Sequence, residues 1–282
     1  MSYSPGLFVG IDLATRIERA ERSLLEEAAR SVATRADQVV ISEIDSGRAL
    51  WVGPGSPLNK VVGVLGNDFP DALLDEVENA FAERNSAVNF EVSTLADPEL
   101  VTRLTRRGYA LVGFENVLGL RLDGQSRPRA AGVEVADVAS DGLESWLDVV
   151  ADGFGAPDIR GVAAHEEHSR DAARSAISDT SAASGFVPSL ATIDGVPAGG
   201  AIRRLYEGIA QFSGASTLPE FRRRGVQGTL LAHRIDAATA AGCDLAVVVT
   251  LPGSTSQQNV QKLGFQLLYV RAVLVREVET IR

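Results

Sequence analysis

The residues best suited to chemistry lie in one stretch, residues 216–231 (STLPEFRRRGVQGTLL). A strand-like segment ends at a proline, an arginine-rich turn follows, and glycines surround the start of an apolar helix. The turn contains Arg222, Arg223, Arg224, Gly225 and Gly228. The first N–H groups of a helix have no intrahelical partner and lie at the positive end of its dipole, so this turn could hold phosphate oxygens. Taken alone, the segment also fits a solvated basic turn.

The elements that must position this turn follow from periodicity and turn residues. Three consecutive extended runs separated by Asp-Gly and Glu-Gly predict antiparallel strands. A helix with apolar residues at helical spacing ends before Gly242. The run LAVVVT is apolar on both faces and predicts a buried central strand. The predicted elements are a helix around Leu143 and Val150 capped by Ser140 or Asp141, strands 187–194, 198–206 and 209–217, a helix around 230–238, strand 245–250, helix 256–263 and strand 265–278.

The N-terminal half repeats this order of elements. A shift of 156 positions places Gly108-Tyr109 on Gly264-Phe265 and residues 73–85 on the helix that follows the basic turn. Such agreement favours a tandem duplication. The predicted elements of this half are helices 13–32 and 73–85 and strands 39–44, 48–52 and 60–65. We therefore predict domains at residues 1–122 and 131–282, joined by a polar linker at 123–130 (containing DGQSRPR).

The basic turn resembles the acyl-CoA-binding motif of the GNAT superfamily of N-acyltransferases, R/Q-x-x-G-x-G/A. The matching run is Arg222-Arg223-Arg224-Gly225-Val226-Gln227-Gly228, with Gln227 in the second Gly/Ala position. Residues 261–265 (QKLGF) resemble the second motif of that family. The resemblance implies an α/β chain (α+β mixed sheet) of two tandem GNAT-like domains. Each would be a mostly antiparallel twisted sheet flanked by helices, with a splayed central strand pair.

The resemblance also implies a reaction. Acetyl-CoA would be the cosubstrate, with its pantetheine in the splay, and a backbone N–H around Thr217 and Leu218 would polarise the thioester. A primary amine, on a small molecule or a protein, would attack directly in a ternary complex, so that catalysis is mainly positioning. The expected cofactor-binding residues are Ser216, Thr217, Leu218, Arg222, Arg223, Arg224, Gly225, Val226, Gln227, Gly228 and Thr229. We expect Gly225→Glu to abolish CoA binding while leaving the fold intact.

No catalytic residue is assigned. The position where many members carry a general-acid tyrosine is Val260 here, and the strand LAVVVT supplies no acidic base. Nearby Asn259 and Tyr269 are better interpreted as structural. Two other hypotheses therefore stay open: a non-catalytic acyl-CoA-binding or regulatory module, and a structural protein in which both copies have decayed.

The N-terminal copy lacks the phosphate turn. Gly66 and Phe69 stand where the second copy has Arg222 and Gly225, and two aspartates, Asp68 and Asp71, would repel a diphosphate. We predict that this degenerate copy does not bind CoA and instead completes the sheet or shapes the acceptor cleft.

Composition excludes several other classes of protein. Among 282 residues, 27 Lys+Arg against 37 Asp+Glu give a net charge of −10, which disfavours a nucleic-acid partner. The single cysteine, Cys243, forbids an internal disulfide, and His165 and His168 lack the spacing of a metal site, so we expect no metal. With no signal-peptide pattern and no apolar run near 18 residues, we expect no membrane partner and a cytoplasmic location. The sequence carries no signal of oligomeric state.

Overall fold

The computed structural model describes residues 7–156, 160–163 and 169–278, which form two compact units. Of the described residues, unit 1 takes 7–8, 116–163 and 169–268, and unit 2 takes 9–115 and 269–278. Strands β5 (Ala110–Arg121) and β11 (Gln266–Arg276) therefore each begin in one unit and end in the other. Unit 1 thus contains the end of β5 from the first half of the chain, and unit 2 contains the end of β11 from the second half. The division into residues 1–122 and 131–282 stays a prediction about the repeats.

Unit 1 is built on a sheet in which a single neighbouring pair is parallel. The strand order is β5, β10, β9, β8, β7, β6, and only β9 and β10 run in the same direction among these described strands. The strands other than β5 are β6 (Glu134–Asp137), β7 (Phe186–Ile193), β8 (Val196–Tyr206), β9 (Ile209–Thr217) and β10 (Leu245–Thr250). The predicted strand 245–250 has these same limits because its run of apolar, β-branched residues is buried, as a central strand requires.

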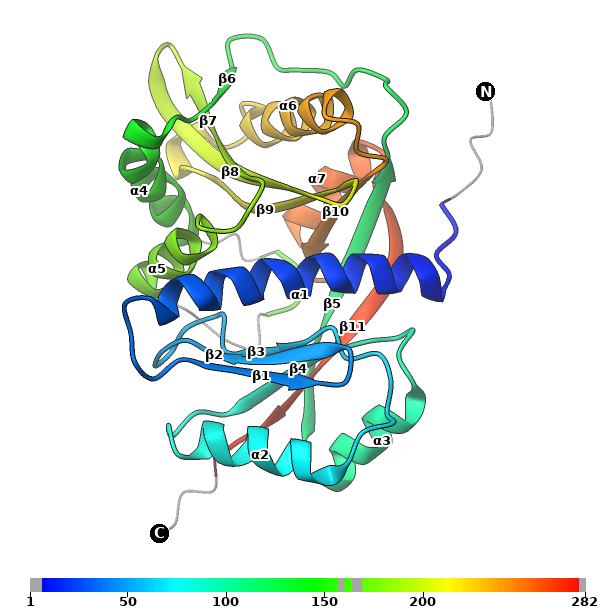
Figure 1. The fold of residues 1–282 in the computed structure, drawn as a ribbon. Helices are drawn as coiled ribbons and strands as arrows, with labels where there is room; N and C mark the ends of the chain where they lie inside the picture. Colours follow the sequence, from blue (N-terminus) through cyan, green and yellow to red (C-terminus); the bar gives the residue numbers. More distant parts are fainter. Residues whose placement is uncertain (1–6, 157–159, 164–168, 279–282) are drawn as a thin grey trace. The chain divides into compact units, whose positions relative to one another are not determined.

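Helices cover both faces of the unit 1 sheet (Figure 1). On β8, Ala201 packs with the cluster that includes Leu230 of α6, whereas its neighbour Ile202 packs with Trp146 of α4. Because successive side chains of a strand alternate between faces, α4 and α6 lie on opposite sides. The helices are α4 (Leu143–Phe154), α5 (Arg170–Thr180), α6 (Val226–Ala240) and α7 (Thr255–Lys262), with 3-10 turns η1 (Ser140–Gly142) and η2 (Pro219–Phe221).

The predicted cap of α4 is wrong. Ser140 and Asp141 belong to η1, and Gly142 occupies the N-cap position with no side-chain cap. A 3-10 turn before the helix satisfies N–H groups by a backbone route, so no hydroxyl or carboxylate is needed there.

Unit 2 repeats the plan with a shorter sheet. Its strands follow the order β1, β2, β3, β4, β11, with β3 and β4 parallel and the other pairs antiparallel. Figure 1 shows α1 along one face and α2 along the other. The elements are α1 (Ile11–Ala33), β1 (Val40–Ile44), β2 (Gly47–Trp51), β3 (Lys60–Val62), α2 (Asp71–Ala82), β4 (Val88–Ser93) and α3 (Pro98–Arg106). The mixed sheets flanked by helices confirm the predicted fold class.

Candidate functional site

The candidate site of unit 1 begins where β9 and β10 separate. The described pairing of these parallel strands runs from Leu245↔Ile209 to Val248↔Phe212, although β9 continues to Thr217. A bulge explains the divergence: between Gly200↔Ser216 and Ile202↔Ser213, one residue of β8 faces two of β9. A bulge bends its strand away from the regular ladder. This confirms the predicted splay of the central strand pair.

The start of α6 presents backbone donors beside this splay. Gly225 is the N-cap with φ +83°, and Arg223 also has a positive φ of +62°. Positive φ values at alternate residues direct successive backbone N–H groups to one side of the chain, and the result is a concavity that suits anions. The amides of Val226, Gln227 and Gly228 have no hydrogen-bond partner among the described residues, whereas the amide of Thr229 donates to Gly225 O at 3.0 Å. Three donors at the positive end of a 15-residue helix are therefore available.

The three arginines of the turn divide into two kinds. Arg222 is occupied by the protein: its Nε donates to Thr217 O at 3.3 Å and its Nη2 to Ala156 O. Arg223 and Arg224 are exposed, and the Arg224 guanidinium lies 5.5 Å from the centre of the Phe221 ring. Arg222 therefore braces the turn, and Arg223 and Arg224 supply the charge that a ligand could meet.

At the end of β9, one backbone N–H is directed toward the gap between β9 and β10. Ser216 is buried and its hydroxyl donates to Val150 O at 3.1 Å, while the amide of Leu218 donates to Ala198 O at 3.0 Å. Because successive amides of a strand point to opposite sides, the Thr217 amide faces away from β8, toward the splay. Of the expected pair Thr217 and Leu218, Thr217 is the residue whose N–H is directed into the gap.

The two glycines of the turn differ in the space around them. A Cβ on Gly225 would lie 2.4 Å from the Cβ of Ala130, in a backbone conformation that favours glycine. A Cβ on Gly228 would meet nothing within 4 Å. Thr229 holds the neighbouring chain in place, because its Oγ1 accepts from the Ala130 amide at 3.0 Å and donates to Gly225 O at 3.1 Å. A side chain at Gly225 would therefore strain the turn, so the intact fold of Gly225→Glu stays a prediction, and Gly228 is the open position.

The residues around the missing tyrosine are structural. Val260 is 1% exposed and packs in the cluster that includes Val248 and Phe265. Tyr269 belongs to unit 2, where its hydroxyl donates to Glu18 Oε1 at 2.6 Å, and burial together with the Glu18 charge raises its pKa. His165 and His168 lie outside the described residues. Cys243 is buried, as a small core residue should be.

An ion cluster that the sequence analysis missed anchors α6. Asp137 of β6 accepts from Arg203 Nη1 at 2.7 Å and from Ser189 Oγ at 3.0 Å, and its Oδ1 lies 2.8 Å from His233 Nε2. The hydrogen bonds from Arg203, together with the His233 contact, hold the pKa of Asp137 far below its ordinary value, although burial of the carboxylate acts in the opposite direction. The cluster ties α6, the helix that follows the basic turn, to the outer strands. These residues are far apart in the chain, and no motif joins them.

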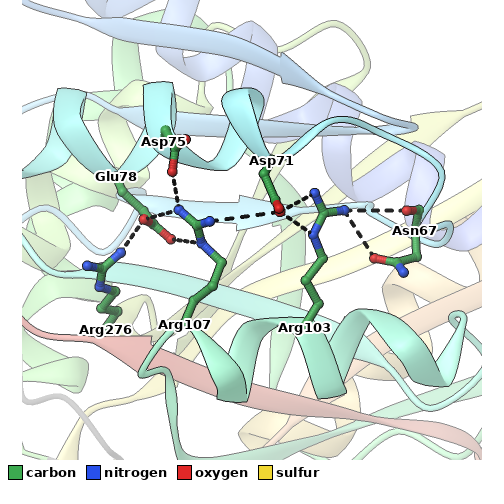
Figure 2. Close-up of polar contacts among 7 residues, drawn as sticks. All are labelled: Asn67, Asp71, Asp75, Glu78, Arg103, Arg107 and Arg276. Atoms are coloured by element: carbon green, nitrogen blue, oxygen red, sulfur yellow. Dashed lines mark hydrogen bonds and ion pairs between the residues drawn. The ribbon is translucent and has the colours of Figure 1, made fainter.

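In the N-terminal copy, the counterpart of the turn is filled by the protein's own side chains (Figure 2). Asp71, the first residue of α2, accepts from Arg103 Nε at 2.8 Å and Nη2 at 2.6 Å. Phe69 stands where unit 1 has Gly225, with the Arg103 guanidinium 4.5 Å from its ring centre. Arg107 binds Glu78 at 2.9 Å and 2.6 Å. A cavity of about 320 Å³ remains beside these ion pairs, lined by Asn67, Asp71, Glu99, Arg103, Arg106 and Arg107.

The part of the chain that the structure describes contains neither a metal-binding cluster nor a membrane-spanning helix. Over residues 7–156, 160–163 and 169–278, His, Cys, Asp and Glu side chains nowhere gather in a group of three or more that could hold a metal ion. Within the same ranges, no helix combines the length and apolar character needed to cross a membrane.

Comparison with known proteins identifies the fold. No protein-family model and no curated protein sequence matches the chain. Among solved structures, a GCN5-related N-acetyltransferase from Kribbella flavida is similar, with 20% identity and a TM-score of 0.67 over 94% of this chain and 96% of that one. A tandem GNAT protein from the clavulanic acid biosynthesis pathway is 13% identical, with a TM-score of 0.62 and 98% of each chain covered. The fold is thus that of the GCN5-related N-acetyltransferases. In this chain it is present in tandem, as predicted.

Proposed function

We propose that this protein is an acyl-CoA-dependent N-acyltransferase whose second copy binds the nucleotide thioester. It transfers an acetyl group from acetyl-CoA to a primary amine. The observation that carries the proposal is the set of three amides, on Val226, Gln227 and Gly228, that have no partner among the described residues and lie at a helix start beside splayed parallel strands. The similar proteins named as N-acetyltransferases share this fold and support the same chemistry.

The binding mode follows from the donors. The diphosphate lies against the three amides, where the helix dipole favours negative charge, and Arg223 and Arg224 add charge from solvent. The pantetheine arm runs into the splay, where the residues of β9 beyond Phe212 have no partner on β10 in the described pairing. The thioester then lies near Thr217, whose amide is directed into the gap.

The transfer is a direct attack. The amine nitrogen forms a bond to the thioester carbonyl carbon, the carbon–sulfur bond breaks, and its electron pair leaves on sulfur as the CoA thiolate. The amine arrives neutral and loses its surplus proton to solvent. Holding both reactants in line supplies much of the barrier reduction, on the order of several kcal/mol.

The first copy has a supporting role. Asp71, Arg103 and Phe69 occupy the place that a diphosphate would need, and the acid at the start of α2 would repel it. We propose that unit 2 binds no CoA.

Release of free thiol from acetyl-CoA tests the proposal, measured with a panel of primary amines and protein substrates. Turnover with at least one amine is expected, together with stabilisation of the protein by CoA. The absence of any thermal stabilisation by CoA would refute the proposal. Tight CoA binding without thiol release would instead support a non-catalytic acyl-CoA-binding module, the alternative that the buried Val260 favours.

A further inference from the structure

Thr250 carries a buried hydroxyl that makes no hydrogen bond to any residue that the structure describes. It is the last residue of β10 and is 5% exposed. Its Oγ1 is buried without a hydrogen-bond partner among the described residues. Buried hydroxyls almost always find a partner, because an unsatisfied one keeps its full desolvation cost. Folding alone therefore does not explain why a hydroxyl is buried at position 250.

The position of Thr250 places this hydroxyl at the mouth of the splay. Val248 is the last residue of β10 in the described pairing with β9, and Thr250 follows two residues later. Side chains two apart on a strand share a face, so Thr250 faces the same side as Val248, toward the cluster that contains Val260 of α7. Across the sheet it is paired with Asn116 of β5, which is also buried. Two buried polar side chains thus lie at the end of an otherwise apolar face, where β10 no longer pairs with β9 in the described register.

We propose that the Thr250 hydroxyl donates a hydrogen bond to the thioester group of the bound acyl-CoA. This inference rests on the proposed function. The ligand supplies an acceptor that the described residues do not, so the Thr250 hydroxyl gains a hydrogen-bond partner in the complex. The contact orients the thioester toward Thr217 on the facing strand. It needs no proton transfer from threonine, whose hydroxyl only donates a hydrogen bond to an atom of the thioester.

A structural role would favour a different residue. Valine has nearly the shape of threonine, is a good strand former and has no hydroxyl to desolvate. If packing alone mattered, Thr250→Val would be neutral or stabilising and would leave ligand binding unchanged. The stability of the free protein and the affinity for the thioester are therefore expected to move in different directions.

The test compares two ligands and two variants of the full-length protein. Acetyl-CoA carries the thioester, whereas desulfo-CoA keeps the diphosphate and the rest of the pantetheine arm but lacks the terminal sulfur and the acyl group. We expect Thr250→Val to weaken acetyl-CoA binding by about three- to tenfold in isothermal titration, the effect of one lost hydrogen bond. We expect its affinity for desulfo-CoA to be unchanged and its Tm without ligand to be equal or higher. Thr250→Ser keeps the hydroxyl and should bind acetyl-CoA within about twofold of the wild type.

Three outcomes would overturn the inference. Unchanged acetyl-CoA affinity in Thr250→Val would show that the hydroxyl does not meet the thioester. Equal weakening of both ligands, or a fall in Tm without ligand, would show a structural role. If desulfo-CoA binds the wild type and only the Thr250 effect is missing, the inference fails and the proposed function stands. If the wild type binds neither ligand, both fail.

Discussion

Substitutions at Gly228 separate folding from ligand binding at the phosphate turn. Gly228 is the third residue of α6, and a Cβ there would meet nothing within 4 Å. Gly228→Ala should therefore stabilise the helix by about 0.5–1 kcal/mol through backbone entropy. Gly228→Glu should be tolerated equally well, since a carboxylate in the first turn interacts favourably with the dipole by about 0.3–1 kcal/mol. Both proteins should fold at least as well as the wild type.

The two variants should differ in their response to CoA. CoA at about 100 times its Kd stabilises the folded state by about 2.7 kcal/mol, which for a chain of this size raises Tm by about 5–10 °C. The glutamate places a negative charge among the amides that would hold the diphosphate. At about 4 Å and an effective dielectric constant near 20, the repulsion is about 4 kcal/mol, close to a thousandfold in Kd. Thermal-shift titration should show the CoA response in wild type and Gly228→Ala and none in Gly228→Glu. A full response in Gly228→Glu would refute this placement of the diphosphate.

Four further outcomes are expected. Arg223→Ala should weaken CoA binding by about two- to fivefold in dilute buffer and less at about 1 M salt, because the side chain is exposed and its charge is screened; titration at two ionic strengths measures this. Asp71→Asn removes a surface carboxylate that Arg103 contacts, so chemical denaturation should show a loss of about 0.2–1 kcal/mol, with CoA affinity unchanged. Burial and the Glu91 charge raise the pKa of Glu115 from 4.5 to about 7; the folded state keeps this proton while the unfolded state loses it, so stability falls as pH rises through that window. Glu115→Gln should therefore raise Tm above pH 7 and leave it nearly unchanged at pH 4. Leu231→Ala should cost about 2–5 kcal/mol of unfolding free energy in urea, because the side chain is buried in the core between α6 and the sheet.

The sequence was sufficient wherever local chemistry decides the structure. Strand β9 has the predicted limits because glycine turns and Pro219 bound it, and α6 is periodic and ends before Gly242. Gly225, which the sequence places in the turn before α6, has a φ of +83°, a conformation that favours glycine. These features depend on a few neighbouring residues, which a sequence displays directly.

The features that the sequence did not reveal depend on distant residues. A strand pattern shows which face of β11 is apolar but not which strand it pairs with, so its pairing with β4 was not predicted. The charge of Arg222 suits a phosphate ligand, yet its guanidinium donates a hydrogen bond to the carbonyl of Ala156, 66 positions away in the chain. The unsatisfied hydroxyl of Thr250 is a property of its surroundings and leaves no trace in the spacing of residues.

A crystal structure of the protein with bound CoA tests the central claim most directly. We predict diphosphate oxygens within hydrogen-bond distance, about 2.7–3.2 Å, of the amides of Val226, Gln227 and Gly228, with the pantetheine arm between β9 and β10. CoA bound elsewhere, with those three amides left to solvent, would contradict the account.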